Sequence, residues 1–167
     1  MNRFEWKWGL LIGGASLAWL LLAWGLGWHS SGIGLIQLAM GFPVILSFVG
    51  YFLAMFFLFR REPETTFPEG FRAGALIATM AAIVVVLGHF LYLRYLNPGF
   101  TDYMVEMTLR HFSNAGLTEE QLAEVAAGAA QTFGLRSFLV QAGAGALLQG
   151  VVFSAVAAGV MRWRAVR

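Results

Sequence analysis

The sequence predicts an all-α, polytopic membrane protein, a bundle of four transmembrane helices with an amphipathic helical hairpin outside the membrane. Of its 167 residues, 59% are hydrophobic and only 12% are charged, which is about half the charged share of a soluble domain. Four apolar stretches are each long enough to cross about 30 Å of hydrocarbon as a helix. The long polar stretch falls between the third and the fourth. The length suits a single membrane domain, residues 1–167.

The first two predicted spans cover residues 8–28 and 33–59. Arg3 and Lys7 precede the first span, as basic residues do in a signal peptide. The apolar core is too long for such a peptide, however, and no small-x-small cleavage site follows it. We therefore expect an uncleaved anchor. Pro43 lies inside the second span and is expected to kink it.

The third predicted span covers residues 73–96 and stops at a turn. The turn consists of Asn97, Pro98 and Gly99. A proline has no backbone donor and disfavours helical backbone at the residue before it, and a glycine adds backbone freedom. The chain is therefore expected to leave the membrane here.

The polar stretch, residues 100–134, predicts two consecutive amphipathic helices. In the first, apolar side chains recur every three or four residues, and Thr101 or Asp102 is the expected N-cap. In the second, Thr118 and Gln121 form a capping box. The two arms make a helical hairpin whose apolar faces need cover. The other arm, the membrane surface or a partner could each supply it.

The fourth predicted span, residues 137–161, carries a small residue at every fourth position. This helix-packing ladder consists of Ala142, Ala146, Gly150, Ser154 and Ala158. Small residues let helices approach closely in a bilayer, where lipid supplies no hydrophobic force between them. The ladder is expected to face another helix, either of the same chain or of a second subunit.

The distribution of Lys and Arg predicts the orientation. Eight of the eleven basic residues fall at the termini or between the second and third spans, and three fall on the opposite side. The eight are Arg3, Lys7, Arg60, Arg61, Arg72, Arg162, Arg164 and Arg167, and the three are Arg94, Arg110 and Arg136. The positive-inside rule then places both termini in the cytoplasm, and we expect a multi-pass protein of the bacterial inner membrane.

Three polar residues inside the spans are candidates for an intramembrane role. His89 continues the inward face of the third span, and Gln141 and Gln149 lie on similar faces of the fourth, about two turns apart. An ionisable group within a span is a functional candidate by default. The alternative is structural: the glutamines bond across helices, and the histidine bonds a neighbouring polar group. No Asp or Glu occurs in a span core, which counts against ion-coupled transport.

No catalytic, metal or cofactor site is predicted. Cys is absent, which excludes disulfides and thiolate chemistry. No His pair has metal-ligand spacing, and no Gly-rich phosphate loop or nucleophile elbow is present. The net charge is only +2, so no nucleic-acid partner is expected. The carboxylates outside the membrane are interpreted as caps and as the wet face of the hairpin.

Several motifs, in order, resemble a bacterial integral membrane family known mainly from Bacteroidetes, domain of unknown function 4199. The motifs are "FPEGFRAGALIA" (residues 67–78), "YLNPGFTDYMVE" (95–106) and "AGLTEEQLAE" (115–124). The resemblance implies four spans and an outer helical insert, and it implies no activity. Gly99 stands where the family often has an acidic residue, so no role for that carboxylate is transferred.

Three functions were compatible with these features. The leading hypothesis, the association hypothesis, is a non-enzymatic integral membrane protein that acts through association, as an accessory or assembly subunit or as a homo-oligomer. Its partners are then the lipid bilayer and either another membrane protein or a second copy of itself. The alternative is a small transporter or channel, which predicts a polar cavity containing His89, Gln141 and Gln149. A membrane-embedded enzyme or metal site is the third, and it predicts that His29 or His111 converges with Asp102 or Glu106.

Overall fold

A computed structural model describes residues 3–113 and 115–165 of the chain, and every regular element in those ranges is a helix. The long helices are α1 (Arg3–Gly25), α2 (Ile33–Arg61), α3 (Phe67–Leu91) and α6 (Leu135–Ala165). All four are long and apolar enough to cross a membrane. The shorter elements are η1 (Trp28–Ser30), η2 (Tyr92–Leu96), α4 (Phe100–Phe112) and α5 (Glu119–Phe133). The predicted all-α class with four apolar spans is thereby confirmed.

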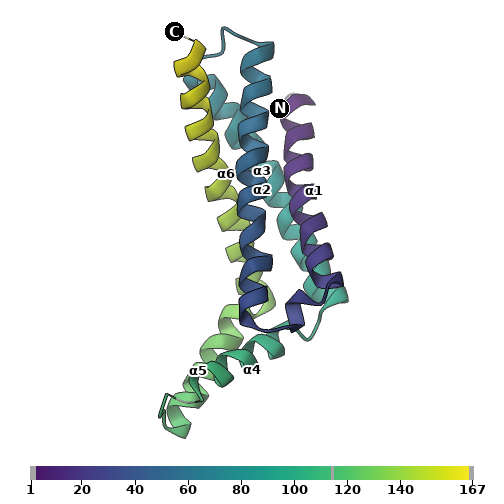
Figure 1. Cartoon of the computed structure of the whole chain (residues 1–167), viewed down its shortest axis with the longest axis vertical. Coiled ribbons are helices and arrows are strands. Elements are labelled where there is room, and N and C mark those ends of the chain that lie inside the picture. The colour runs from purple at the N-terminus through teal and green to yellow at the C-terminus, as the bar shows by residue number, and fades with distance from the viewer. Residues whose placement is uncertain (1–2, 114, 166–167) are drawn as a thin grey trace.

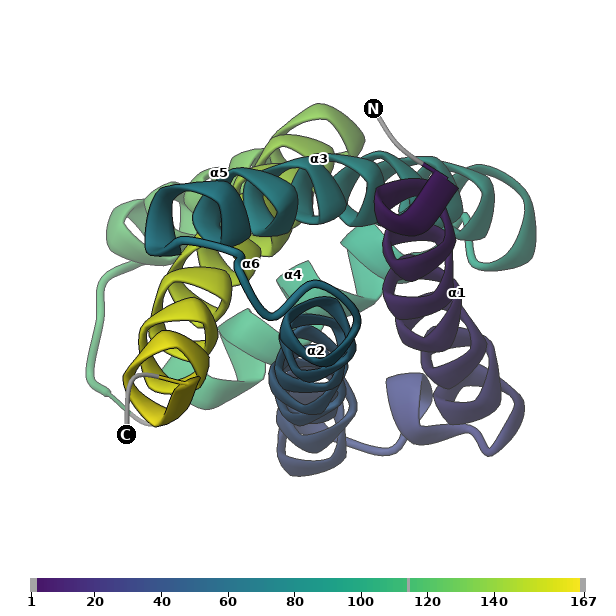
Figure 2. The same cartoon turned by 90° about the horizontal axis from the view of Figure 1, so that it is seen from above.

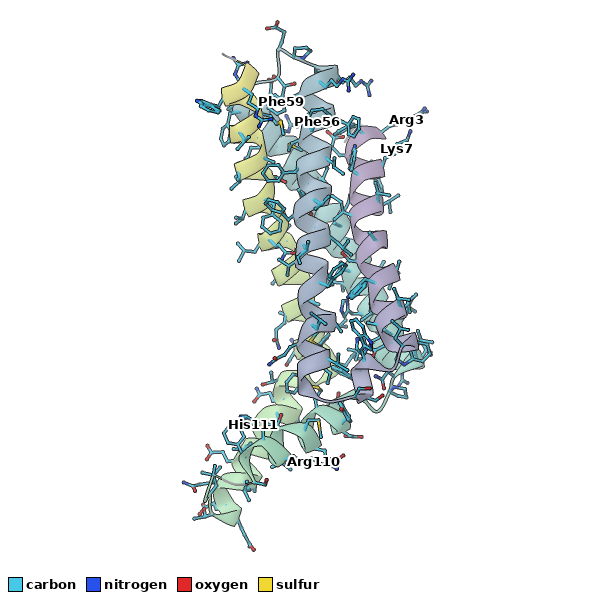
Figure 3. All side chains as sticks on the ribbon, in the orientation of Figure 1. Arg3, Lys7, Phe56, Phe59, Arg110 and His111 are labelled. Atoms are coloured by element: carbon cyan, nitrogen blue, oxygen red, sulfur yellow. The ribbon has the colours of Figure 1, made fainter. Side chains whose placement is uncertain are left out.

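The four long helices lie side by side, and α4 and α5 project from one end as a hairpin (Figure 1). Both ends of the chain lie at the opposite end of the bundle. We call these the hairpin end and the terminal end. The side chains of Arg3 and Lys7 extend from the terminal end, whereas Arg110 and His111 lie on the hairpin (Figure 3). Arg167, one of the basic residues used to predict orientation, lies outside the described residues.

The predicted boundary of the first span was wrong at its end. Residues 8–28 were expected to be one helix, but α1 stops at Gly25. Gly27 has a φ of 75°, a left-handed backbone conformation that a helix cannot continue through and that glycine adopts without strain. The chain then makes the short turn η1 before α2 begins.

Helix α3 is central, with α1 on one side and α6 on the other (Figure 2). Glycines permit both close contacts. A Cβ on Gly13 of α1 would lie 3.0 Å from the Ala81 carbonyl oxygen, and a Cβ on Gly74 of α3 would overlap the Ser154 side chain of α6. The backbones therefore approach more closely than larger residues would allow.

The hairpin is held to the bundle at several points. Phe100 and Met104 of α4 are buried in a cluster with Ile36 of α2. The Gly32 backbone N–H donates to the Tyr103 hydroxyl (3.1 Å). Leu109 of α4 faces the apolar side of α5 across a shallow groove, so the two arms face each other along this part of the hairpin.

The capping prediction was right for α5 and wrong for α4. Thr118 and Gln121 form the predicted capping box. Helix α4 begins at Phe100 with Gly99 as N-cap, two residues before the nearer of the two expected caps, Thr101. The Thr101 hydroxyl instead donates to the Phe133 carbonyl oxygen at the end of α5 (3.0 Å). This tertiary bond replaces the local cap and joins the two arms at their base.

Candidate functional site

A cavity of about 260 Å³ lies among the long helices, in the half of the bundle next to the hairpin. Its walls come from α1, α2, α3 and α6, and η1, η2 and α4 close it toward the hairpin. The wall is mostly apolar. Its polar residues are Ser16, His29, Ser47, His89, Tyr92, Gln141 and Gln149. The three intramembrane candidates of the sequence therefore line one cavity, although they come from two different helices.

The contacts between α3 and α6 give the depth of this cavity. Val86 lies opposite Gly143, and Ala78 lies opposite Gly150. Helices α3 and α6 run antiparallel, so His89 lies toward the hairpin and Gln149 is level with the residue after Ala78. At 1.5 Å per helical residue, the levels of His89 and Gln149 are about 15 Å apart along the bundle.

The cavity is closed toward the terminal end by the packed half of the bundle. A Cβ on Gly150 would overlap the Tyr51 ring and hydroxyl and would lie 2.7 Å from the Ala78 Cβ, so these residues meet without a gap. Below them lies a core of buried apolar side chains from all four long helices, including Ile12, Met55 and Ile77. The structure therefore holds a cavity with one closed end and no continuous passage along the described bundle.

Two buried hydroxyls lie just beyond the closed end. Tyr51 is 1% exposed and Ser154 is fully buried, and neither hydroxyl has a hydrogen-bond partner among the described residues. An unsatisfied buried polar group costs about 1–3 kcal/mol. These two hydroxyls are thus the groups of the packed half that could still form a hydrogen bond with a water molecule or a ligand.

A hydrogen-bonded chain closes the cavity toward the hairpin. The Asn97 side-chain amide donates to the Tyr92 hydroxyl (2.7 Å), and that hydroxyl lies 2.5 Å from Nδ1 of His29. Because the Tyr92 oxygen accepts from Asn97, its own proton is available to His29 Nδ1. Neutral His29 then carries its proton on Nε2. Phe100 of the hairpin packs edge-on against the His29 and Tyr92 rings.

Burial keeps His29 uncharged. The side chain is 4% exposed, and this burial, together with the nearby His89, lowers the pKa of His29 below its ordinary value of 6.5. Removing an imidazolium from water is costly, and a second imidazole close by adds to the cost. At neutral pH this end of the cavity therefore carries a neutral hydrogen-bonding group.

His89 offers the cavity a hydrogen-bond acceptor. Its Nδ1 lies 2.8 Å from the Val85 carbonyl oxygen, one turn earlier in α3. A carbonyl oxygen can only accept, so Nδ1 carries the proton of the neutral ring. Nε2 then has a lone pair and no proton, and His89 is part of the cavity wall. The predicted bond to a neighbouring polar group exists, and it leaves the other ring nitrogen available.

The other polar residues differ in how far the protein satisfies them. Gln141 is exposed at the rim, and its amide donates to the Thr132 carbonyl oxygen of α5 (3.1 Å). Ser16 donates to the carbonyl oxygen of Ile12 (3.1 Å). Ser47 is 8% exposed, and neither it nor the half-buried Gln149 has a hydrogen-bond partner among the described side chains and backbone. The deep end of the cavity therefore holds two polar groups with unused hydrogen-bonding capacity.

The cavity opens sideways between α2 and α6. The exposed members of its wall are Met40 and Val44 on α2 and Gln141 and Gly145 on α6. These two helices meet further toward the terminal end, where Phe48 packs edge-on against Phe153. The opening is thus on the long side of the bundle, between two of its apolar helices.

The small-residue ladder serves two purposes. Gly150, Ser154 and Ala158 are buried against α3, where they meet Ala78, Gly74 and Gly70. Ala142 and Ala146 instead line the cavity. Gly150, Ser154 and Ala158 therefore contact α3 of the same chain. The small side chains of Ala142 and Ala146 leave room for the cavity.

The groups considered for metal binding or catalysis do not meet. His29 is bonded to Tyr92 at the cavity end, whereas Asp102, Glu106 and His111 are exposed on α4. Glu106 forms an i,i+4 ion pair with Arg110 (2.5 Å). Among the described residues, no group of three or more His, Asp or Glu side chains could hold a metal ion.

The sequence analysis did not identify His29, Tyr92 and Ser47 as parts of the cavity. The sequence held a signal for two of them: Ser47 follows Pro43 by one turn, on the same side of α2, and Tyr92, the first residue of η2, follows His89 of α3 by three residues. The contribution of η1 had no signal, because it depends on how the loop between α1 and α2 folds back over the bundle.

Comparison with known proteins gives one match. A family described as Protein of unknown function (DUF4199) matches residues 7–162, which is nearly the whole chain and includes every residue of the cavity wall. No curated protein and no solved structure matches the chain.

Proposed function

The chain belongs to the DUF4199 family, and because that description assigns no activity, we propose a function from the cavity: it binds a small lipophilic molecule that enters from the membrane between α2 and α6. The single observation that supports this proposal best is the convergence of His89, Gln141 and Gln149 on one cavity in a bundle of apolar helices. Polar side chains inside a membrane bundle are costly unless they serve a purpose. An apolar wall with a few convergent polar groups is the usual form of a small-molecule site.

We further propose that the protein lies in the bacterial inner membrane with both termini in the cytoplasm. Arg3, Lys7 and the basic residues at the end of α2 and the start of α3 support this orientation, since they gather at the terminal end. The hairpin is then extracytoplasmic, and the cavity lies in the outer half of the membrane. A ligand would reach it from the outer leaflet.

The orientation can be tested directly, because the chain contains no cysteine. Glu120→Cys lies on the exposed start of α5, and Glu64→Cys lies in the exposed loop between α2 and α3. We expect a membrane-impermeant maleimide to label Glu120→Cys in intact spheroplasts, and Glu64→Cys only after permeabilisation. The reverse pattern would place the cavity in the inner half instead.

Ligand binding can be tested by native mass spectrometry of the protein released from nanodiscs made with its own membranes. We expect wild type to retain a small molecule that Gly145→Trp loses. Gly145 lines the opening, and a Cβ there meets no heavy atom within 4 Å, so a side chain can begin at this position without overlap and we expect the indole to obstruct the opening. Ala144→Trp is the matched control, because Ala144 is exposed next to Gly145 but is not part of the wall.

Equal retention by wild type and Gly145→Trp would contradict the proposal, and so would an empty wild-type protein. The same spectra test the association hypothesis. A stoichiometric protein partner or a defined oligomer in place of a small molecule would favour it. The packed part of the ladder faces α3 of the same chain, so association would have to use another surface.

We propose a binding or transport role rather than an enzymatic one. The carboxylates considered for a catalytic site, Asp102 and Glu106, are exposed on α4 and are not part of the cavity wall. The unpartnered groups at the deep end are a hydroxyl and an amide, which hydrogen-bond a ligand but are weak acids and bases at neutral pH. No cofactor or nucleic-acid partner is part of the proposal.

A further inference from the structure

The cavity has two polar levels. At the hairpin side, His89 presents an unprotonated ring nitrogen, close to the His29 and Tyr92 pair. At the deep side, Ser47 and Gln149 have unused hydrogen-bonding groups. The other two polar residues of the wall outside this hairpin-side group, Ser16 and Gln141, already donate to backbone carbonyl oxygens, and the rest of the wall is apolar. The levels of His89 and Gln149 are about 15 Å apart along the bundle. A single small polar group therefore cannot hydrogen-bond to both residues.

The wall offers no partner for a charge. Its described residues include no Asp, Glu, Lys or Arg. His89 Nδ1 is committed to the Val85 carbonyl oxygen, and His29 is buried. An ion without a counter-charge in such a site loses its hydration with little compensation. A charged ligand is therefore disfavoured at both levels.

From these observations we infer that the cavity binds an elongated, uncharged amphipathic molecule with a hydrogen-bonding group at each end. At the hairpin side that group donates to Nε2 of His89, which requires a hydroxyl or an N–H. At the deep side the group pairs with the Gln149 amide or the Ser47 hydroxyl, each of which can donate and accept. The inference rests on the proposed function, because it specifies the ligand class for the same cavity.

A series of three compounds with one chain length tests this inference. The probes are dodecane-1,12-diol, dodecan-1-ol and, at alkaline pH, dodecanoate. Each is added to the full-length protein in nanodiscs, and its apparent Kd is obtained from the rise in thermal stability. We expect the diol to bind about tenfold more tightly than the alcohol, since it makes one further buried hydrogen bond. Dodecanoate should bind most weakly.

Variants at the two levels separate specific binding from partition into lipid. We expect His89→Phe and Gln149→Leu each to reduce the affinity for the diol to about that for the alcohol. His111→Phe, on the exposed face of α4, should leave the ranking unchanged. Each variant is first checked for an unaltered melting temperature without probe, and Gln149→Ala replaces Gln149→Leu if the latter does not fold.

The inference would be overturned if dodecanoate bound as tightly as the diol, if diol and alcohol were equal, or if no probe raised the stability of wild type. These outcomes differ from failure of the proposed function. If wild type retains a small molecule that Gly145→Trp does not retain, the cavity binds a ligand. In that case only the ligand class inferred here is wrong.

Discussion

Gly74→Ala should destabilise the bundle strongly, although alanine favours helix over glycine by about 1 kcal/mol. A Cβ at this position would overlap both the Cβ and the hydroxyl of Ser154, which is fully buried. Neither helix can yield locally, because Ala78 and Gly150 are in tight contact one turn away. Forcing an extra methyl group into a packed core costs typically 1–3 kcal/mol and sometimes more. We expect a clear fall in melting temperature in detergent or nanodiscs.

A second substitution at Ser154 tests this contact more sharply than Gly74→Ala alone. Ser154→Gly removes the two overlapping atoms, and the nearest remaining atom to the added Cβ on residue 74 is then the Cα of residue 154, at an ordinary distance of 3.5 Å. The double variant Gly74→Ala/Ser154→Gly should therefore recover most of the stability that Gly74→Ala loses. Gly14→Ala is the control, because its Cβ meets no heavy atom within 4 Å. Equal effects of Gly74→Ala and Gly14→Ala would show that the helices are not packed as described.

This contact illustrates what the sequence could and could not predict. Helices were predictable from local properties: apolar length for the spans, and capping residues for α5. Which helices touch depends on how whole surfaces fit. The spacing of Gly150, Ser154 and Ala158 indicated a packing face, but not that α3 of the same chain covers it.

The candidate site was predictable in part for the same reason. His89, Gln141 and Gln149 were identifiable because polar residues are rare in spans. Their convergence, and the contributions of Ser47, Tyr92 and His29, arise from the arrangement of helices and from a loop that folds back over the bundle. A one-residue shift of α6 would move Gln149 to another face, and sequence patterns do not fix helix rotation that finely.

Trp19→Phe should cost about 1–3 kcal/mol of stability, because it leaves a buried carbonyl oxygen without a donor. Pro43 has no backbone N–H, so the carbonyl of Ala39, one turn earlier in α2, cannot form its helical bond. The Trp19 indole N–H of α1 donates to that oxygen instead (2.8 Å). Its ring also packs on Phe42, with centroids 4.1 Å apart. A shift in the denaturation midpoint measures the loss.

A double-mutant cycle isolates the hydrogen bond from the lost packing. In the Pro43→Ala background, residue 43 regains an N–H that can bond to the Ala39 carbonyl oxygen within α2. Trp19→Phe should then cost less, with a coupling energy of about 1 kcal/mol. Trp24→Phe, at an exposed position of α1, should show no coupling to Pro43→Ala. Ala39 and Pro43 both line the cavity, so a measured coupling would indicate that the Trp19 hydrogen bond helps to hold this wall in place. Additive effects would mean that packing alone fixes the position of α2.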